Sequence, residues 1–127
     1  MVKAEDYPKD PRAALGRLSE ELGAAWLEAR GMKILERNYR NRTGEIDLIG
    51  KLKDVLVIVE IRSRSSLLWG SPAESVNYRK QYKIKQVAAY YRMQKGWTDC
   101  ECRFDVLSIL MSQTEGTARI DWYPNAF

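Results

Sequence analysis

The chain has 127 residues, of which 45% are apolar and 30% are charged, and 21 Lys and Arg against 17 Asp and Glu give a formal net charge of +4. This composition predicts one folded domain over residues 1–127 and excludes a disordered chain. The absence of histidine excludes nucleophilic catalysis that depends on a Ser-His or Cys-His pair, and zinc sites that need His ligands.

A first helix is expected to begin at Asp10-Pro11, a capping carboxylate followed by proline, and to end at Gly31. One face has apolar residues at helical spacing: Leu15, Leu18, Leu22, Ala25, Trp26 and Ala29. A second face combines Glu20 with small or apolar residues, namely Ala13, Gly16, Ala24 and Leu27. Small residues gather where a helix comes close to a neighbouring element, so this second face predicts a close contact beside Glu20.

Three strands are expected next, over residues 33–38, 45–49 and 54–62. The connections between them are short, which favours antiparallel hairpins. The third segment is the most β-branched run of the chain and is expected to be a central strand.

Further along the chain, Ser71 to Glu74 has a capping-box arrangement, so a helix or helical turn is expected to start near there and to end at Gly96. Residues 103–111 predict a strand that pairs in parallel with the third strand through a right-handed crossover, and residues 117–123 predict an edge strand. The order α-β-β-β-α-β predicts an α/β domain with a mixed sheet and helices on its faces.

Basic residues are concentrated in the second helix. Residues 76–95 contain no acidic residue, four tyrosines, and the six cations Arg79, Lys80, Lys83, Lys85, Arg92 and Lys95. Such a segment suits a phosphate backbone, with tyrosines to stack or hydrogen-bond beside it. A solvated basic helix face explains the pattern equally well at this point.

Two further features bear on location and redox chemistry. Cys100 and Cys102 are too few for a structural zinc site, and two ordinary thiols in a reducing compartment are the favoured interpretation. The first residues lack an apolar stretch like that of a secretory signal, and the longest apolar run, Val55 to Val59, is too short to span a bilayer. We therefore expect a cytoplasmic protein without a membrane partner.

Two acidic residues, Asp47 and Glu60, stand in otherwise apolar strand segments, which is costly unless they are exposed, paired or bound to a cation. Glu60 and Arg62 share a strand face, and a hairpin would bring Asp47 to the same place. Such a site suits Mg²⁺ or Mn²⁺ and phosphodiester chemistry; a surface ion pair with Arg62 is the alternative. Lys80 falls within the apolar stripe of its helix, so it either points into this site or extends its stem to solvent at the stripe's edge.

Longer segments of the chain resemble a known family. They are Leu15 to Glu20, Gly31 to Arg40, Gly44 to Ile49, Val59 to Arg64, Lys80, and Arg103 to Val106. Together they resemble the YraN-like family of small bacterial proteins, within the PD-(D/E)XK nuclease-like superfamily and related to Holliday-junction resolvases. The resemblance covers a core of about residues 12–111, with a short N-terminal tail and a C-terminal extension.

The resemblance implies a three-layer restriction-endonuclease-like fold and a metal-dependent endonuclease acting on DNA phosphodiesters, with branched DNA as one candidate substrate. It implies that Glu20, Asp47 and Glu60 are the acids of the site, with Mg²⁺ or Mn²⁺ on Asp47 and Glu60. Arg62 departs from the family pattern, which usually has lysine here. Either Arg62 supplies only positive charge, or Lys80 substitutes for that lysine, or catalysis has been lost.

The expected phosphate contacts are Arg64, which matches the basic residue after the motif, and Arg79, Lys83 and Lys85 on the basic helix. Asp105 is expected in a structural ion pair at a strand end. A homodimer is implied by the related resolvases, and the aromatic residues Trp122, Tyr123 and Phe127 either serve its interface or cap the core. Two alternatives to a nuclease stay open: a nucleic-acid-binding module of the same fold that does not cut, and an interaction protein whose carboxylates are only ion-paired.

Overall fold

The computed structural model describes residues 11–64, 76–111 and 117–127, with side chains from residue 16 onward. Its elements, in chain order, are α1 (Pro11–Glu28), β1 (Lys33–Asn41), β2 (Gly44–Leu52), β3 (Val55–Arg64), α2 (Tyr78–Lys95), β4 (Glu101–Met111) and β5 (Ala118–Tyr123). The strands form one mixed sheet in the order β1-β2-β3-β4-β5, in which only β3 and β4 pair in parallel. This confirms the predicted mixed α/β architecture and is consistent with a restriction-endonuclease-like fold.

The helix ends follow the expected local chemistry. Gly31 has a φ of 96° after α1, and Gly96 has a φ of 71° after α2, left-handed conformations that glycine adopts without strain. The capping box at residues 71–74 lies outside the described residues. In the described part of the chain, α2 begins at Tyr78, where the side chain of Asn77 accepts a hydrogen bond from the backbone N–H of Lys80.

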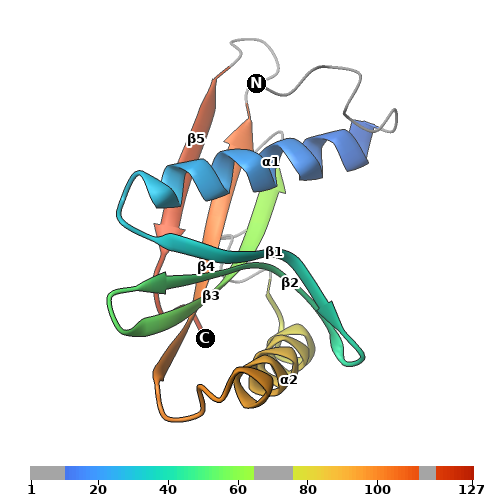
Figure 1. The fold of residues 1–127 in the computed structure, drawn as a ribbon. Helices are drawn as coiled ribbons and strands as arrows, with labels where there is room; N and C mark the ends of the chain where they lie inside the picture. The colour runs from blue at the N-terminus through green and yellow to red at the C-terminus, as the bar shows by residue number, and fades with distance from the viewer. Residues whose placement is uncertain (1–10, 65–75, 112–116) are drawn as a thin grey trace.

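The two helices cover opposite faces of the sheet, which makes three layers (Figure 1). Each face of the sheet has its own hydrophobic core, and alternate residues of β3 pack into one or the other. Val57 and Val59 pack with α1 residues, whereas Leu56 and Ile58 pack with α2 residues. The third strand is buried on both faces and central, as its apolar run predicted. Glu60 lies on the α2 side of this alternation.

The face of α1 that packs on the sheet is the small-residue face. Ala24 and Leu27 are fully buried, and Gly23 lies so close to the sheet that an added Cβ would come within 3.0 Å of a methyl carbon of Leu107. The other face, with apolar residues at helical spacing, is only partly buried, since Leu18 and Leu22 of this leucine stripe are 37% and 36% exposed. Close approach at a glycine, rather than the leucine stripe, decides which way α1 faces and therefore where Glu20 lies.

The C-terminal segment is tied to the sheet by Asp105, which is fully buried. Its carboxylate accepts hydrogen bonds from the Arg103 guanidinium at 2.9 and 2.8 Å, from the Trp122 indole at 2.8 Å and from the Asn125 backbone N–H at 2.8 Å. The structural ion pair is present, but Asp105 lies within β4 and not at its end. Trp122 and Phe127 pack against the two cores, so these aromatics cap the core.

Neither described helix is long and apolar enough to cross a membrane.

Candidate active site at Asp47 and Glu60

The site begins where β2 separates from β3. The two strands pair in register only from Leu52 opposite Val55 as far as Leu48 opposite Val59. Continuing that register would place Ile61 opposite Ile46, but the backbone N–H of Ile61 instead donates to Oδ2 of Asp47 at 2.8 Å. The side chain of Asp47 thus replaces a backbone acceptor, and this bond fixes its carboxylate at the opening between the strands.

Glu60 lies next to Asp47 and is only 8% exposed. Burial is the main cause that raises the pKa of Glu60 to about 8, followed by the hydrogen bond and charge of Asp47, while the charges of Lys80 and Arg62 lower it. A hydrogen bond between two carboxyl groups requires a proton, so Asp47 favours the protonated form of Glu60. Without that proton the two carboxylates repel each other, and a bound cation would relieve this repulsion in its place.

Two cations complete the surroundings of Glu60. Nζ of Lys80 lies 3.5 Å from Oε1 of Glu60, so this side chain reaches the site from the first turn of α2. Arg62 follows two residues after Glu60 on β3 and acts on its pKa. The two alternatives for Lys80 are thereby decided in favour of a side chain that points into the site, although 42% of it is exposed.

Glu20 approaches the same place from α1. Its pKa is raised chiefly by burial and further by the charge of Asp47, while a side-chain hydrogen bond with Asn38 lowers it. Asp47 therefore acts on the pKa of an acid on α1 and on that of an acid on β3. Asn38 was not singled out as a site residue from the sequence. The sequence signal is only an asparagine in an expected strand segment. In the structure Asn38 has a φ of 50°, a conformation that asparagine tolerates better than most residues.

The predicted phosphate contacts are spread more widely. Arg64 is half-buried at the end of β3, two residues beyond Arg62, whereas Arg79 and Lys83 are exposed on α2. Lys85 is directed elsewhere, since its Nζ lies 5.6 Å from the ring centre of Phe104 and 5.9 Å from that of Phe127. The structure brings Asp47, Glu60, Arg62 and Lys80 together and places Glu20 where it interacts with the charge of Asp47. It leaves Lys85 on the flank of α2 that faces the C-terminal segment.

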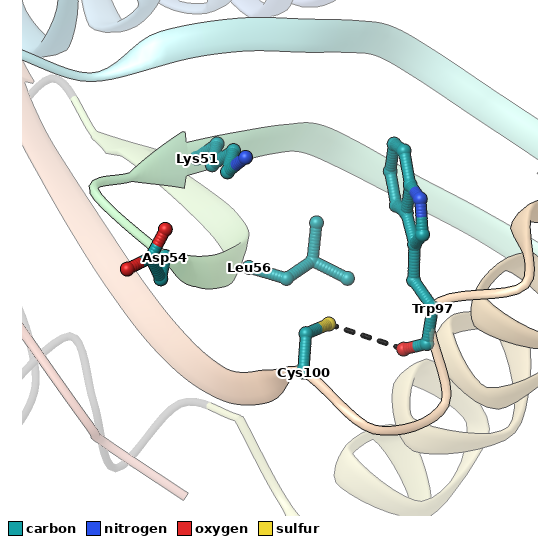
Figure 2. Close-up of a pocket in the computed structure, with 5 residues that line it drawn as sticks. All are labelled: Lys51, Asp54, Leu56, Trp97 and Cys100. Atoms are coloured by element: carbon teal, nitrogen blue, oxygen red, sulfur yellow. Dashed lines mark hydrogen bonds between the residues drawn. The ribbon is translucent and has the colours of Figure 1, made fainter.

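A pocket of about 210 Å³ lies away from these carboxylates, at the other end of β3 (Figure 2). Leu56, Trp97 and Cys100 line it together with Lys51 and Asp54, and Sγ of Cys100 donates to the backbone oxygen of Trp97 at 3.1 Å. Leu56 precedes Glu60 by four residues on an extended strand, a separation of about 13 Å. This pocket is therefore distinct from the carboxylate site.

Comparison with known proteins identifies the family. Residues 19–109 match the family described as "Uncharacterised protein family UPF0102". The chain is 41% identical over 118 residues to a UPF0102 protein of Pelotomaculum thermopropionicum, an alignment that covers 93% of this chain and 98% of the relative. It is 40% identical over 113 residues to a UPF0102 protein of Dictyoglomus turgidum, which covers 89% and 96%. The chain belongs to the UPF0102 family. The resemblance to the YraN-like family, within the PD-(D/E)XK nuclease-like superfamily, is thereby confirmed.

The carboxylates of this UPF0102 protein suit a hard divalent cation. Among the residues that the structure describes, no group of three or more Asp, Glu and Cys side chains is close enough to hold a metal ion. Mg²⁺ is commonly bound by only one or two carboxylates, with waters and substrate phosphate as its other ligands. The adjacent carboxyl groups of Asp47 and Glu60 fit that pattern; burial first, and then the hydrogen bond and charge of Asp47, raise the pKa of Glu60.

Proposed function

We propose that this protein is a metal-dependent endonuclease that hydrolyses DNA phosphodiesters at the Asp47–Glu60 site. The observation that carries the proposal is the buried Glu60 beside Asp47, with the ammonium group of Lys80 at 3.5 Å. A buried acid next to a second acid is unfavourable for folding, so an arrangement of this kind favours a functional explanation.

Asp47 and Glu60 would hold Mg²⁺ or Mn²⁺ between them. When bound, the ion supplies Lewis acidity at the phosphate and an activated water. Asp47 is already oriented for this role, because one of its oxygens accepts from Ile61. Glu20, held by Asn38 and close to Asp47, would act on the same site from α1, directly or through a water.

Lys80 and Arg62 would hold the scissile phosphate. A guanidinium binds a phosphate through two parallel hydrogen bonds, but it stays protonated and cannot take a proton from water. Arg62 therefore supplies charge alone in this proposal, and Lys80 takes the role that a lysine has at the Arg62 position elsewhere in the superfamily.

Arg62 also favours a second candidate function, a nucleic-acid-binding module that holds DNA without cutting it. In that case the carboxylates are retained as an ion-paired structural cluster with Lys80 and Arg62. The two functions differ in whether DNA is cut when metal is supplied and in whether DNA binding persists when metal is removed.

Cleavage of labelled single-stranded, duplex, flap and four-way-junction DNA with Mg²⁺ or Mn²⁺ tests the proposal. We expect Asp47→Ala and Glu60→Ala to abolish cleavage, and Arg62→Lys to keep it. Glu28→Ala is the matched control, because it removes an exposed carboxylate at the end of α1, which pairs with Arg37 away from the site.

Metal binding has a readout of its own. A ligand that binds only the folded chain raises its thermal midpoint, so Mg²⁺ or Mn²⁺ should stabilise the wild type and Glu28→Ala but not Asp47→Ala. Cleavage by Arg62→Lys alone would mean an intact site disabled at one residue. DNA binding without cleavage by any variant would reject the nuclease in favour of the binding module.

A further inference from the structure

The outer face of α2 carries two aromatic side chains that are largely exposed to solvent. Tyr78 is 87% exposed and Tyr82 is 64% exposed, although tyrosine normally buries its ring. They are four residues apart on one helix, so both rings lie on the same face, separated by about 6 Å along the axis. Single exposed aromatics are ordinary, but two aligned rings form a small stacking surface.

Hydrogen bonding helps to order the second of these rings. Nε2 of Gln86 donates to the hydroxyl oxygen of Tyr82 at 3.0 Å, which ties the ring to the next turn of the helix. A ring held at its edge keeps a face available for a planar partner. This contact reduces the conformational entropy that a stacking partner would otherwise have to remove.

Within the segment that carries the rings, the side-chain charge is of one sign. Residues 76–95 contain no acidic side chain, and Arg79 and Lys83 are exposed beside the tyrosines. At 100° per residue, Lys83 and then Arg79 lie between Lys80 and the two tyrosines around the helix. A continuous track of positive charge thus leads from Lys80, which contacts Glu60, to the two rings.

We propose that Tyr78 and Tyr82 stack on unpaired bases of a DNA strand whose backbone runs along Lys80, Lys83 and Arg79. The occupant is a single-stranded segment, because bases in a duplex are already stacked on each other and do not offer their faces to a side chain. The inference rests on the proposed function and deepens it: the substrate is DNA with an unpaired segment next to the cleavage site.

Binding is measured by fluorescence anisotropy of the full chain with EDTA present, so that no metal-dependent cleavage interferes. The probes are a short labelled oligothymidine strand, a strand of equal length made of abasic sites, and a duplex of equal length. Stacking on each tyrosine is expected to contribute about tenfold in affinity, so the wild type should prefer thymidine to the abasic strand by at least that factor.

Two paired variants isolate the rings. The double substitution Tyr78→Ala with Tyr82→Ala should weaken binding of the thymidine strand by about tenfold or more and leave the abasic strand and the duplex unchanged. Tyr78→Phe with Tyr82→Phe should bind like the wild type. Met93→Ala is the matched control, because Met93 is 63% exposed on the same helix, and it should bind all three probes like the wild type.

The outcomes separate this inference from the proposed function. Equal wild-type affinity for the thymidine and abasic strands, or an equal loss on the duplex in the double alanine variant, would overturn the stacking surface even if the protein cuts DNA. Binding that depends on bases and on both tyrosines, without cleavage in the metal assay, would support the stacking surface and reject the nuclease. Absence of binding to every probe would overturn the stacking surface.

Discussion

Glu60 and Asp105 are buried acids on neighbouring strands with opposite surroundings. They lie one position apart in the parallel register, where Val59 pairs with Asp105 and Glu60 pairs with Val106. The carboxylate of Asp105 accepts hydrogen bonds from the side chains of Arg103 and Trp122 and from one backbone N–H. Glu60 has a second carboxylate beside it, and its pKa is raised to about 8.

The contrast separates an acid that the fold satisfies from an acid of the proposed site. Burial alone does not, because both side chains are almost inaccessible. What differs is the immediate neighbour: hydrogen-bond donors surround the carboxylate of Asp105, whereas Glu60 has a second carboxyl group beside it, which the partly exposed Lys80 and Arg62 only partly offset. A buried acid beside a second acid breaks the rule that buried charges are paired with opposite charges, and such exceptions tend to occur at functional sites.

The largest expected effect is the loss of the Asp105 carboxylate. Asp105→Ala leaves the Arg103 guanidinium and the Trp122 indole N–H without their acceptor, and removing one partner of a buried ion pair costs about 3–5 kcal/mol. Denaturant unfolding at neutral pH measures this loss. Glu60→Gln, by contrast, should not lower the free energy of unfolding, because the amide can still donate to Asp47 and, unlike the carboxyl group, needs no proton at neutral pH to do so. Equal losses in the two variants would contradict the distinction between the acids.

The second prediction concerns pH. The pKa of Glu60 is raised from 4.5 to about 8 in the folded chain, so folding favours its protonated form. The stability that this proton confers is complete below pH 4.5 and is lost as the pH rises to about 8. Each pKa unit corresponds to about 1.4 kcal/mol, so the metal-free wild type should lose a few kcal/mol over this range.

Unfolding free energies measured across that range in EDTA check the second prediction. Glu60→Gln is the matched variant and should show a clearly weaker decline. The idea fails if wild type and variant decline in parallel, since the pH dependence would then come from other groups.

The smallest effect concerns the cations around Glu60. Lys80→Gln removes a charge that lowers the pKa of Glu60, so that pKa should rise further. An ion pair with a partly exposed lysine contributes about 0.2–1 kcal/mol, which corresponds to less than one pKa unit. Carboxyl NMR titration of Glu60 measures the change. Lys83→Gln, an exposed control on the next turn of α2, should leave the titration of Glu60 where it is in the wild type; an equal shift in both variants would point to a general field effect.

Most of the fold was predictable because its signals are local. The β-branched run at residues 55–59 indicated a central strand, and Gly31 and Gly96 indicated helix ends, because backbone preferences and alternation act over a few residues. The buried face of α1 was harder to predict. Leu18 and Leu22 suggested one face, but close packing at Gly23 selected the other, and packing distance depends on the shape of β3 and β4.

The candidate site was also predictable only in part. Asp47 and Glu60 were recognisable as acids in apolar strands, and Lys80 as a cation in an apolar stripe. Two contacts were not recognisable: Asp47 replaces a backbone acceptor for Ile61, and Asn38 holds Glu20. The first depends on where β2 separates from β3, and the second on how α1 packs beside β1. Lys85 likewise shared the charge pattern of Lys83, yet it lies over the rings of Phe104 and Phe127.

The sequence by itself determined the order of the elements, the mixed sheet and the family, because periodicity, capping residues and motif spacing are properties of neighbouring residues. Only the tertiary structure decided which buried acid lies beside a second carboxyl group and which is surrounded by hydrogen-bond donors. The pKa of Glu60 depends on burial and on Asp47, Arg62 and Lys80, two of which come from other strands or helices. The electrostatic free energy of a carboxylate is set by what surrounds it in space, and that is decided only when the sheet and helices pack together.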